Sequence, residues 1–278
     1  MGGPAPLCYL RFAAMFGLTK RCQATALHLP RPMLLIVAFT IFLPAQIYSQ
    51  TKATIIRKQI VIVRSGEFAK NYPDRTRATI SYPVVSGLRN PAVLRKVRSL
   101  LSVGNIFETS VKEYRENNWL DEFDYVVNYN ANNILDVTFT QSGMAAYPDT
   151  QSRTIPIDLQ TGHLIKAKDI FVEAKLPELA RLVDAKLQRD IAEVILAAKA
   201  DRQLTEVSSV VEALEEAKFE VKDLDEFSIG PKGVTFLYEL GFPHAHRAFE
   251  PNGRYLFSYF DLRMFLKPGG PLAQFINR

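Results

Sequence analysis

The strongest constraint on the fold is the alternation of apolar and polar residues in three segments between residues 124 and 159. Apolar side chains take every second position in Asp124–Asn130, Ile134–Gln141 and Arg153–Leu159, and most residues between them are polar. A period of two places one face of a strand against a core and the other face in water. The three segments are therefore predicted to be strands of an antiparallel sheet, with Val137 and Ile157 on its buried face.

Helical periodicity is found in three other segments. Asn90-Pro91 is a good helix start, because asparagine caps the first turn and proline fits the first helical position. Apolar residues then recur at spacings of four and three from Val93 to Tyr114, and Gly104 is a point where this helix can divide. The same pattern runs from Leu176 to about Lys199 and from about Glu206 to Lys218. These segments are predicted to be amphipathic helices packed on sheets.

The remaining segments complete a fold of the α+β class. The other predicted strands are Thr54–Val63, Arg77–Tyr82, Glu226–Gly230, Val234–Leu240 and Tyr255–Phe260. Pro83 is expected to end its strand and Pro156 to mark an edge or bulged strand, because proline cannot donate to a ladder. The polar stretches Gln141–Ser152 and Gly241–Arg254 are predicted to be loops. We therefore predict antiparallel β-sheet regions packed against amphipathic helices.

Residues 1–49 have the layout of a secretory signal peptide. They carry four basic residues and no acid, with an apolar run from Met33 to Leu43 and then the small residue Ser49, near which cleavage is predicted. Pro32–Thr51 is also 20 residues long without a charge, the minimum that spans a bilayer. An uncleaved membrane anchor is therefore the alternative, and a true start at Met15 is a third reading.

Outside this leader the chain is nearly neutral. Of the 34 lysine and arginine residues, 30 lie beyond residue 49, where all 29 acidic residues also lie. This balance gives no electrostatic reason to expect nucleic-acid binding. Both cysteines, Cys8 and Cys22, lie in the leader. The mature chain is therefore expected to have no disulfide, no cysteine nucleophile and no cysteine-bound metal.

Short motifs in a fixed order resemble a known pair of bacterial extracytoplasmic domains. The motifs are Ile80-Ser81-Tyr82-Pro83, the run Asp158-Leu159-x-Thr161-Gly162-x-Leu164 with Asp169-Ile170-Phe171, and the ending Phe227-Ser228-Ile229, Gly233-Val234, Tyr238 and Tyr259-Phe260-Asp261-Leu262. The first part resembles DUF4163, the domain at the front of the peptidoglycan deacetylase PdaC. The second part resembles DUF3298, which is found with it in the lysozyme-sensing anti-sigma factor RsiV.

The resemblance implies an α+β fold located outside the cytoplasm of a bacterium. It also implies two domains, residues 50–172 (DUF4163-like) and residues 173–278 (DUF3298-like), packed as one unit. The family usually carries a Gly-Ala-His-type segment before the third strand, whereas Gly143–Pro148 has no histidine here. No deacetylase domain and no sigma-binding segment is expected, so neither activity is carried over.

The candidate ligand-binding residues lie in predicted loops. They are Tyr147, Phe242, His244, His246 and Phe249. Aromatic residues in loops are candidates for an exposed contact surface, because loops run over the surface and carry function. By contrast, Tyr255, Phe257 and Tyr259 alternate along a strand and are expected in the core.

The His-x-His pair is also a weak candidate for a metal site. Two imidazoles two residues apart in extended backbone can reach one metal, with Glu239 or Glu250 as a third ligand. No third ligand is fixed by spacing, however, and a polar loop with exposed histidines is the simpler reading.

The acidic residues offer a second chemical hypothesis. Asp121, Glu122 and Asp124 are candidates for a general acid and base, although a solvated charge cluster is commoner at a strand start. Asp158 and Asp169 flank a turn and are expected to accept from turn amides rather than to bind Ca²⁺. The sequence contains no nucleophile elbow, dinucleotide-binding, P-loop or zinc-protease motif. No catalytic residue is therefore assigned and no cofactor is expected.

These observations favour a non-enzymatic, exported binding module at the cell envelope. The partner implied by the resemblance is a lysozyme-like protein or a cell-wall glycan such as peptidoglycan. The alternative is an envelope hydrolase that acts on glycan or peptide through acidic residues or the His-x-His site, and a third reading is a structural envelope component. Contact with a membrane is expected only if the leader is uncleaved.

Overall fold

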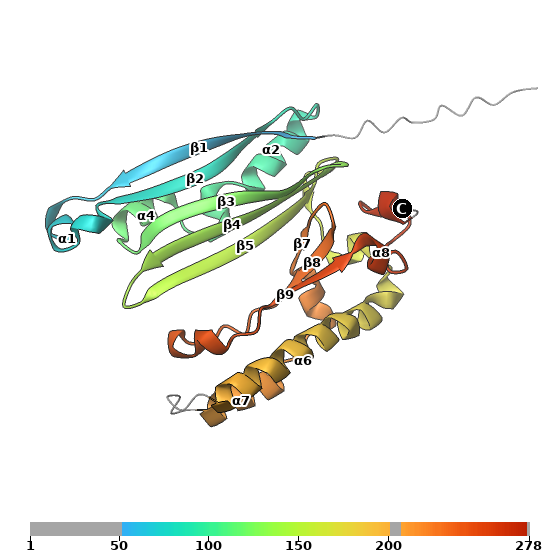
Figure 1. Ribbon diagram of the computed structural model, residues 1–278. Helices are drawn as coiled ribbons and strands as arrows, with labels where there is room; N and C mark the ends of the chain where they lie inside the picture. The colour runs from blue at the N-terminus through green and yellow to red at the C-terminus, as the bar shows by residue number, and fades with distance from the viewer. Residues whose placement is uncertain (1–51, 201–206, 277–278) are drawn as a thin grey trace, which may run out of the picture. The chain divides into compact units, whose positions relative to one another are not determined.

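The three alternating segments form the centre of a six-stranded sheet. The computed structural model describes residues 52–200 and 207–276, so the leader with Cys8 and Cys22 and the helix start at Glu206 lie outside the described residues. The strands are β1 (Thr54–Val63), β2 (Arg77–Ser86), β3 (Leu120–Ala131), β4 (Ile134–Met144), β5 (Pro148–Asp158) and β6 (His163–Leu164). They lie in chain order across the sheet (Figure 1).

Strands β3, β4 and β5 pair antiparallel as predicted, whereas β2 pairs with β3 in parallel. The parallel pairing joins Thr79 to Glu122 and Ile80 to Phe123. Parallel neighbours need a crossover connection. Three helices supply it, namely α2 (Pro91–Leu100), α3 (Val103–Ile106) and α4 (Val111–Glu116). Alternation sets the faces of a strand but not the direction of its neighbour, so this parallel pair left no signal in the sequence.

The helical segment after Asn90 is divided more finely than predicted. Asn90 caps α2 as expected, because its side chain accepts from the backbone nitrogens of Ala92 and Val93. The helix ends before Gly104, however, and a second break precedes Ser110. The side chain of Ser110 accepts from the backbone nitrogen of Glu113, whose carboxylate accepts from that of Ser110. Such a capping box starts a new helix inside an unbroken apolar stripe.

The polar stretch Gln141–Ser152 is a strand hairpin and not the predicted loop. Only residues 145–147 separate β4 from β5. The Nε2 of Gln141 donates to Oε1 of Gln151 at 2.8 Å, and the hydroxyls of Thr140 and Ser152 lie 3.2 Å apart. Polar side chains therefore pair across these strands, and the buried Gln141 is among them, so hydrophobic patterning gives no signal here.

Proline had different effects in two strands. Pro83 does not end β2, which continues to Ser86. Beyond Ile80, β2 pairs only with β1, so proline there interrupts no second ladder. Pro156 does mark an edge, as predicted, since β5 is paired on its outer side only at Ile157 and Asp158.

The second half of the chain contains a long helix and a small antiparallel sheet. Helices α6 (Leu176–Ala200) and α7 (Val207–Glu216) match the prediction within the described residues. The sheet consists of β7 (Phe227–Ile229), β8 (Gly233–Leu237) and β9 (Arg254–Ser258). The shorter elements are α1 (Gly66–Asn71), α5 (Ala167–Ile170), α8 (Tyr259–Leu262) and the 3₁₀ turns η1 (Pro73–Arg75), η2 (Glu173–Lys175), η3 (Val221–Asp225), η4 (His244–Phe249) and η5 (Ala273–Phe275).

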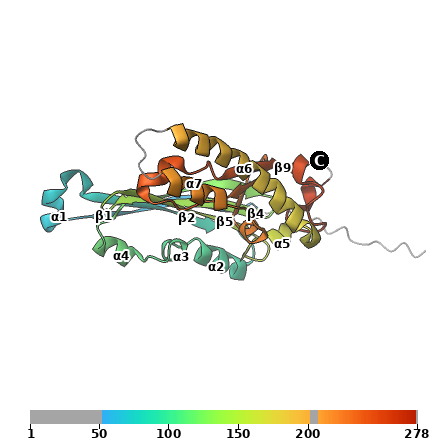
Figure 2. The ribbon, with the colours of Figure 1, turned by 90° about the horizontal axis from the view of Figure 1, so that it is seen from below.

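Helices lie on both sides of the six-stranded sheet. Figure 2 shows α2, α3 and α4 on one face and α6 and α7 on the other. Val137 and Ile157 are fully buried in the core under α2–α4, and Val127 packs against it. The predicted core face is therefore confirmed. Tyr255 and Phe257 are also buried as predicted, in a second core with α6.

The described part of the chain packs as one compact unit. The proposed boundary at residue 172 stays a prediction. None of the helices that the structure describes is long and apolar enough to cross a membrane.

Asp136 of β4 joins the two sheets. Its side chain is 0% exposed. Its neighbours on the strand, Leu135 and Val137, point into the core under α2–α4, so Asp136 points to the opposite face of the sheet. Its Oδ2 accepts from the backbone nitrogen of Ile229 at 2.8 Å, and its Oδ1 accepts from Ser228 Oγ at 3.0 Å and from Asn128 Nδ2 at 2.6 Å. A buried carboxylate is tolerated where donors satisfy it. These bonds fix β7 against β4.

Replacing Asp136 by alanine should lower the free energy of unfolding by about 2–4 kcal/mol, because buried donors lose their acceptor. The measurement is urea unfolding followed by circular dichroism. Asp74→Ala is the control, since Asp74 is exposed. Equal effects of the two substitutions would contradict a role for Asp136 in joining the sheets.

The same carboxyl should give the protein a distinct pH dependence. Burial raises the pKa of Asp136 from its ordinary value of 3.8 to about 6, although its hydrogen bonds oppose the shift. The folded state therefore binds more protons than the unfolded state between about pH 4 and pH 6. The free energy of unfolding should fall as pH rises through this window, by about 3 kcal/mol at most. Urea unfolding from pH 4 to pH 7 should show this fall relative to Asp136→Asn, and parallel profiles would refute it.

Candidate functional site

A cleft of about 270 Å³ lies between β5 and the end of β8. Figure 1 shows the small sheet beside β5. The lining residues are Ser152, Arg153, Thr154, Asp223, Glu226, Leu237, Tyr238 and Glu239.

One wall of the cleft is a row of small polar residues on the large sheet. Ser152 and Thr154 alternate with Ile155, which lies in the core under α2–α4, so they point to the other face. The hydroxyl of Thr154 lies 2.8 Å from that of Thr138, which accepts from Asn128 Nδ2 at 2.7 Å. Asn128 also donates to Asp136, so this wall is continuous with the contact that joins the sheets.

The opposite wall is acidic. Asp223 lies in η3 and accepts from the backbone nitrogen of Glu220 at 2.7 Å, which fixes it at the start of that turn. Glu226 directly precedes β7, and Glu239 follows the end of β8. Both side chains are exposed. No ion pair between any of the three cleft carboxylates and a basic group is found among the described residues.

Two further residues complete the chemistry of the cleft. The guanidinium of Arg153 is turned away, since its Nη1 donates to the carbonyl of Ile106 at 2.6 Å. Burial raises the pKa of Tyr238 above its ordinary value, and the hydroxyl is available as a hydrogen-bond donor. The cleft therefore presents negative charge, an aromatic ring and hydroxyls, a set that suits a cationic group.

The sequence indicated only Glu239 among these acids. Asp223 and Glu226 were missed because they come from a different turn of the chain. The available signal was the acidic cluster at positions 223, 225 and 226, directly before an apolar strand.

The backbone around His244 and His246 is 3₁₀-helical in η4, not the extended chain on which the metal hypothesis depended. Glu250 is also engaged elsewhere, because its Oε1 accepts from the backbone nitrogens of Leu240 and Gly241 at 3.0 Å. The described residues include no group of three or more His, Cys, Asp or Glu side chains able to hold a metal.

The predicted exposed aromatic surface is wrong for Phe242, whereas Phe249 is half-buried and its role stays a prediction. Phe242 is 8% exposed, and Phe249 packs against the same core, because the 241–254 segment folds back onto the second half. Tyr147 is 63% exposed in the turn between β4 and β5. Arg247 of η4 donates to Asp149 at 2.5 Å and holds the pKa of that carboxyl below its usual value. The structure thus brings η4 to the hairpin end that carries Tyr147.

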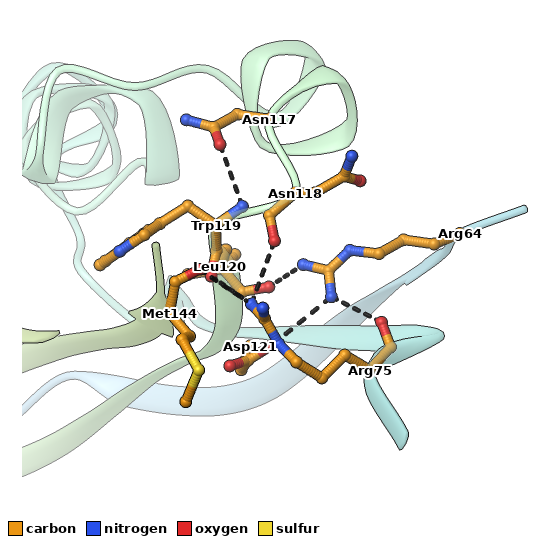
Figure 3. A network of polar contacts seen from close by, with 8 residues as sticks. All are labelled: Arg64, Arg75, Asn117, Asn118, Trp119, Leu120, Asp121 and Met144. Atoms are coloured by element: carbon orange, nitrogen blue, oxygen red, sulfur yellow. Dashed lines mark hydrogen bonds and ion pairs between the residues drawn. The ribbon is translucent and has the colours of Figure 1, made fainter. Parts of the chain in front are cut away.

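Two of the three acid candidates on β3, Asp121 and Asp124, are engaged in ion pairs. Asp124 lies 2.7 Å from Arg57, and Asp121 lies 2.9 Å from Arg75 Nε and 3.5 Å from Arg64 Nη1 (Figure 3). These contacts favour a structural role over general acid–base chemistry. The turn acids behave as expected, since Asp158 accepts from the backbone nitrogen of Gln160 and from the hydroxyl of Thr161, both at 2.8 Å.

Arg64 is buried at the centre of this network, with a side chain that is 2% exposed. Its Nη1 donates to the carbonyl of Arg75 at 2.7 Å and its Nη2 donates to that of Leu120 (Figure 3). The Nη2 of Arg75 in turn donates to the carbonyls of Asn118, Trp119 and Met144 at 3.1, 3.0 and 3.2 Å. The two guanidiniums thereby hold together the ends of β1, β3 and β4.

Arg64→Ala should lower the free energy of unfolding by about 2–4 kcal/mol, because buried carbonyls and Asp121 lose a charged donor. Arg77→Ala is the matched control: Arg77 is exposed at the start of β2, so the change should stay within about 0.5 kcal/mol. Urea unfolding compares the two variants. Similar losses in both would show that the network is dispensable.

Comparisons with known proteins name one family. No family model matches the chain, and no curated protein matches it. The solved structures that are similar include the following two. One is a DUF3298 family protein from Pseudomonas aeruginosa PAO1, with 12% sequence identity and a TM-score of 0.47. The match covers 78% of this chain and 94% of that chain. The other is a DUF3298 family member from Bacteroides fragilis NCTC 9343, with 15% sequence identity and a TM-score of 0.48. The match covers 81% of this chain and 96% of that chain. DUF3298 is also the family that the sequence motifs resemble.

Proposed function

We propose that this protein is a non-enzymatic, exported binding module at the bacterial cell envelope, and that its acidic cleft takes a basic side chain of a lysozyme-like protein. The observation that carries the proposal is the arrangement of Asp223, Glu226 and Glu239 around one cleft, without an ion pair to any described residue. The signal-peptide layout and the resemblance to envelope domains support the location.

The size of the cleft favours a protein partner over a glycan. Sites that enclose a small molecule usually measure about 300–1,000 Å³. A cleft of about 270 Å³ with one acidic wall fits one arginine or lysine side chain better than a run of sugar rings. A guanidinium there can bind Glu226 or Glu239 through two hydrogen bonds and lie against the ring of Tyr238.

The double variant Glu226→Gln/Glu239→Gln tests this function, because it removes two charges with little change in shape. The dissociation constant for a basic lysozyme should rise about tenfold or more, measured by isothermal titration calorimetry with the full-length chain at low salt. Glu67→Gln/Glu116→Gln is the matched control, since both residues are exposed on other helices.

Three results would contradict the proposal. These are no binding by the unaltered protein, equal weakening by both double variants, or binding that is insensitive to salt. Release of soluble fragments from peptidoglycan, lost in the cleft variant alone, would favour the hydrolase alternative instead.

A further inference from the structure

A second charged surface lies on α2 and on the turn that follows β5. Residues 87–107 include Arg89, Arg95, Lys96 and Arg98 and no acid, in a body that is otherwise nearly neutral. All four residues are exposed. Arg98 donates to the carbonyl of Val85 at 2.8 Å, which leaves Arg95 and Lys96 exposed on the helix and Arg89 exposed just before it.

The turn after β5 brings further basic groups to this helix. A pocket of about 460 Å³ lies between them, lined by Lys96, Ser99, Leu100, Gly162, His163, Leu164 and Lys166. We call it the basic pocket. It is separate from the acidic cleft and does not depend on the proposed function.

Gly162 allows the turn to approach α2 this closely. Its φ is +73°, and an added Cβ would lie 3.0 Å from the Cβ of Lys96 and 3.1 Å from the carbonyl of Val93. Asp158 holds the turn through its bonds to Gln160 and Thr161. The pocket is therefore formed by fixed backbone on both sides.

Two basic groups touch at the mouth of the pocket. The ammonium of Lys96 donates to Nε2 of His163 at 2.8 Å. Neither residue forms an ion pair with a carboxylate of the described chain. Lys166 forms a long ion pair with Asp225, with 4.0 Å between the ammonium and Oδ2, and its backbone nitrogen donates to Asp169 at 2.9 Å. Basic groups gathered in this way attract an anion.

We propose that the basic pocket binds a phosphate or carboxylate group of an anionic polymer. Lys96, Lys166 and the hydroxyl of Ser99 supply donors for the oxyanion. Leu100 and Leu164 supply apolar surface for the carbon faces of the polymer. Arg95 continues the positive charge on α2, a helix about 15 Å long, and Arg89 continues it just before the helix start. This extent suits a chain of repeated charges better than one isolated ion.

Binding of poly(glycerol phosphate) and of polygalacturonate to the full-length chain tests the proposal. In Lys96→Glu/Lys166→Glu the dissociation constant should rise at least about tenfold. Lys70→Glu/Lys232→Glu is the control, because it makes the same charge change at exposed positions elsewhere. Its dissociation constant for the polymer should differ from that of the unaltered protein by less than about twofold. Inorganic phosphate should compete with the polymer, and binding should weaken as salt is raised.

Other results would overturn it. Equal weakening in both double variants would show only a general charge effect, provided that thermal melts show both to be folded. Binding to vesicles of phosphatidylglycerol, with none to either polymer, would assign the surface to a lipid headgroup instead. Absence of any polymer binding at low salt would end the proposal, while lysozyme binding through the acidic cleft would be unaffected.

Discussion

The bonds from Ile229, Ser228 and Asn128 to Asp136 are the contact on which the two-sheet arrangement depends. A carboxylate buried in an apolar interface is costly unless several donors surround it. The bonds from β7 form only when that strand lies against β4. Hydrophobic packing holds the two sheets together but allows small shifts of one sheet against the other. The hydrogen bonds to Asp136 are directional, so they fix the position of β7 on β4. They therefore set the position of β8 relative to β5, and with it the shape of the acidic cleft.

The sequence predicted strands and helices best where one face of an element meets a core. Alternation identified the buried faces of β4 and β5 because Val137 and Ile157 have no access to water. The polar pairs of the β4–β5 hairpin lack that signal and therefore looked like a loop. A stripe of apolar residues likewise cannot show where a helix is interrupted, since the capping box at Ser110 keeps the stripe facing the sheet.

The candidate site was harder to predict because it is assembled from distant segments. Thr154 and Glu239 line the same cleft only because the sheets are joined at Asp136. Phe242 was read as exposed from its place in a polar segment, yet the fold returns that segment to the core. Local composition predicts exposure only when no distant element covers the segment.

Net charge conceals a further feature of this molecule. The near-neutral body contains an acid-free basic segment on α2 and a separate acidic group around Asp223 and Glu226. Each set of charges lies at a cavity, where low-dielectric walls strengthen the field more than on a flat surface. Such a body can bind partners of opposite charge at two places without attracting either over its whole surface. A balanced composition therefore argues against nucleic-acid binding but not against electrostatic recognition.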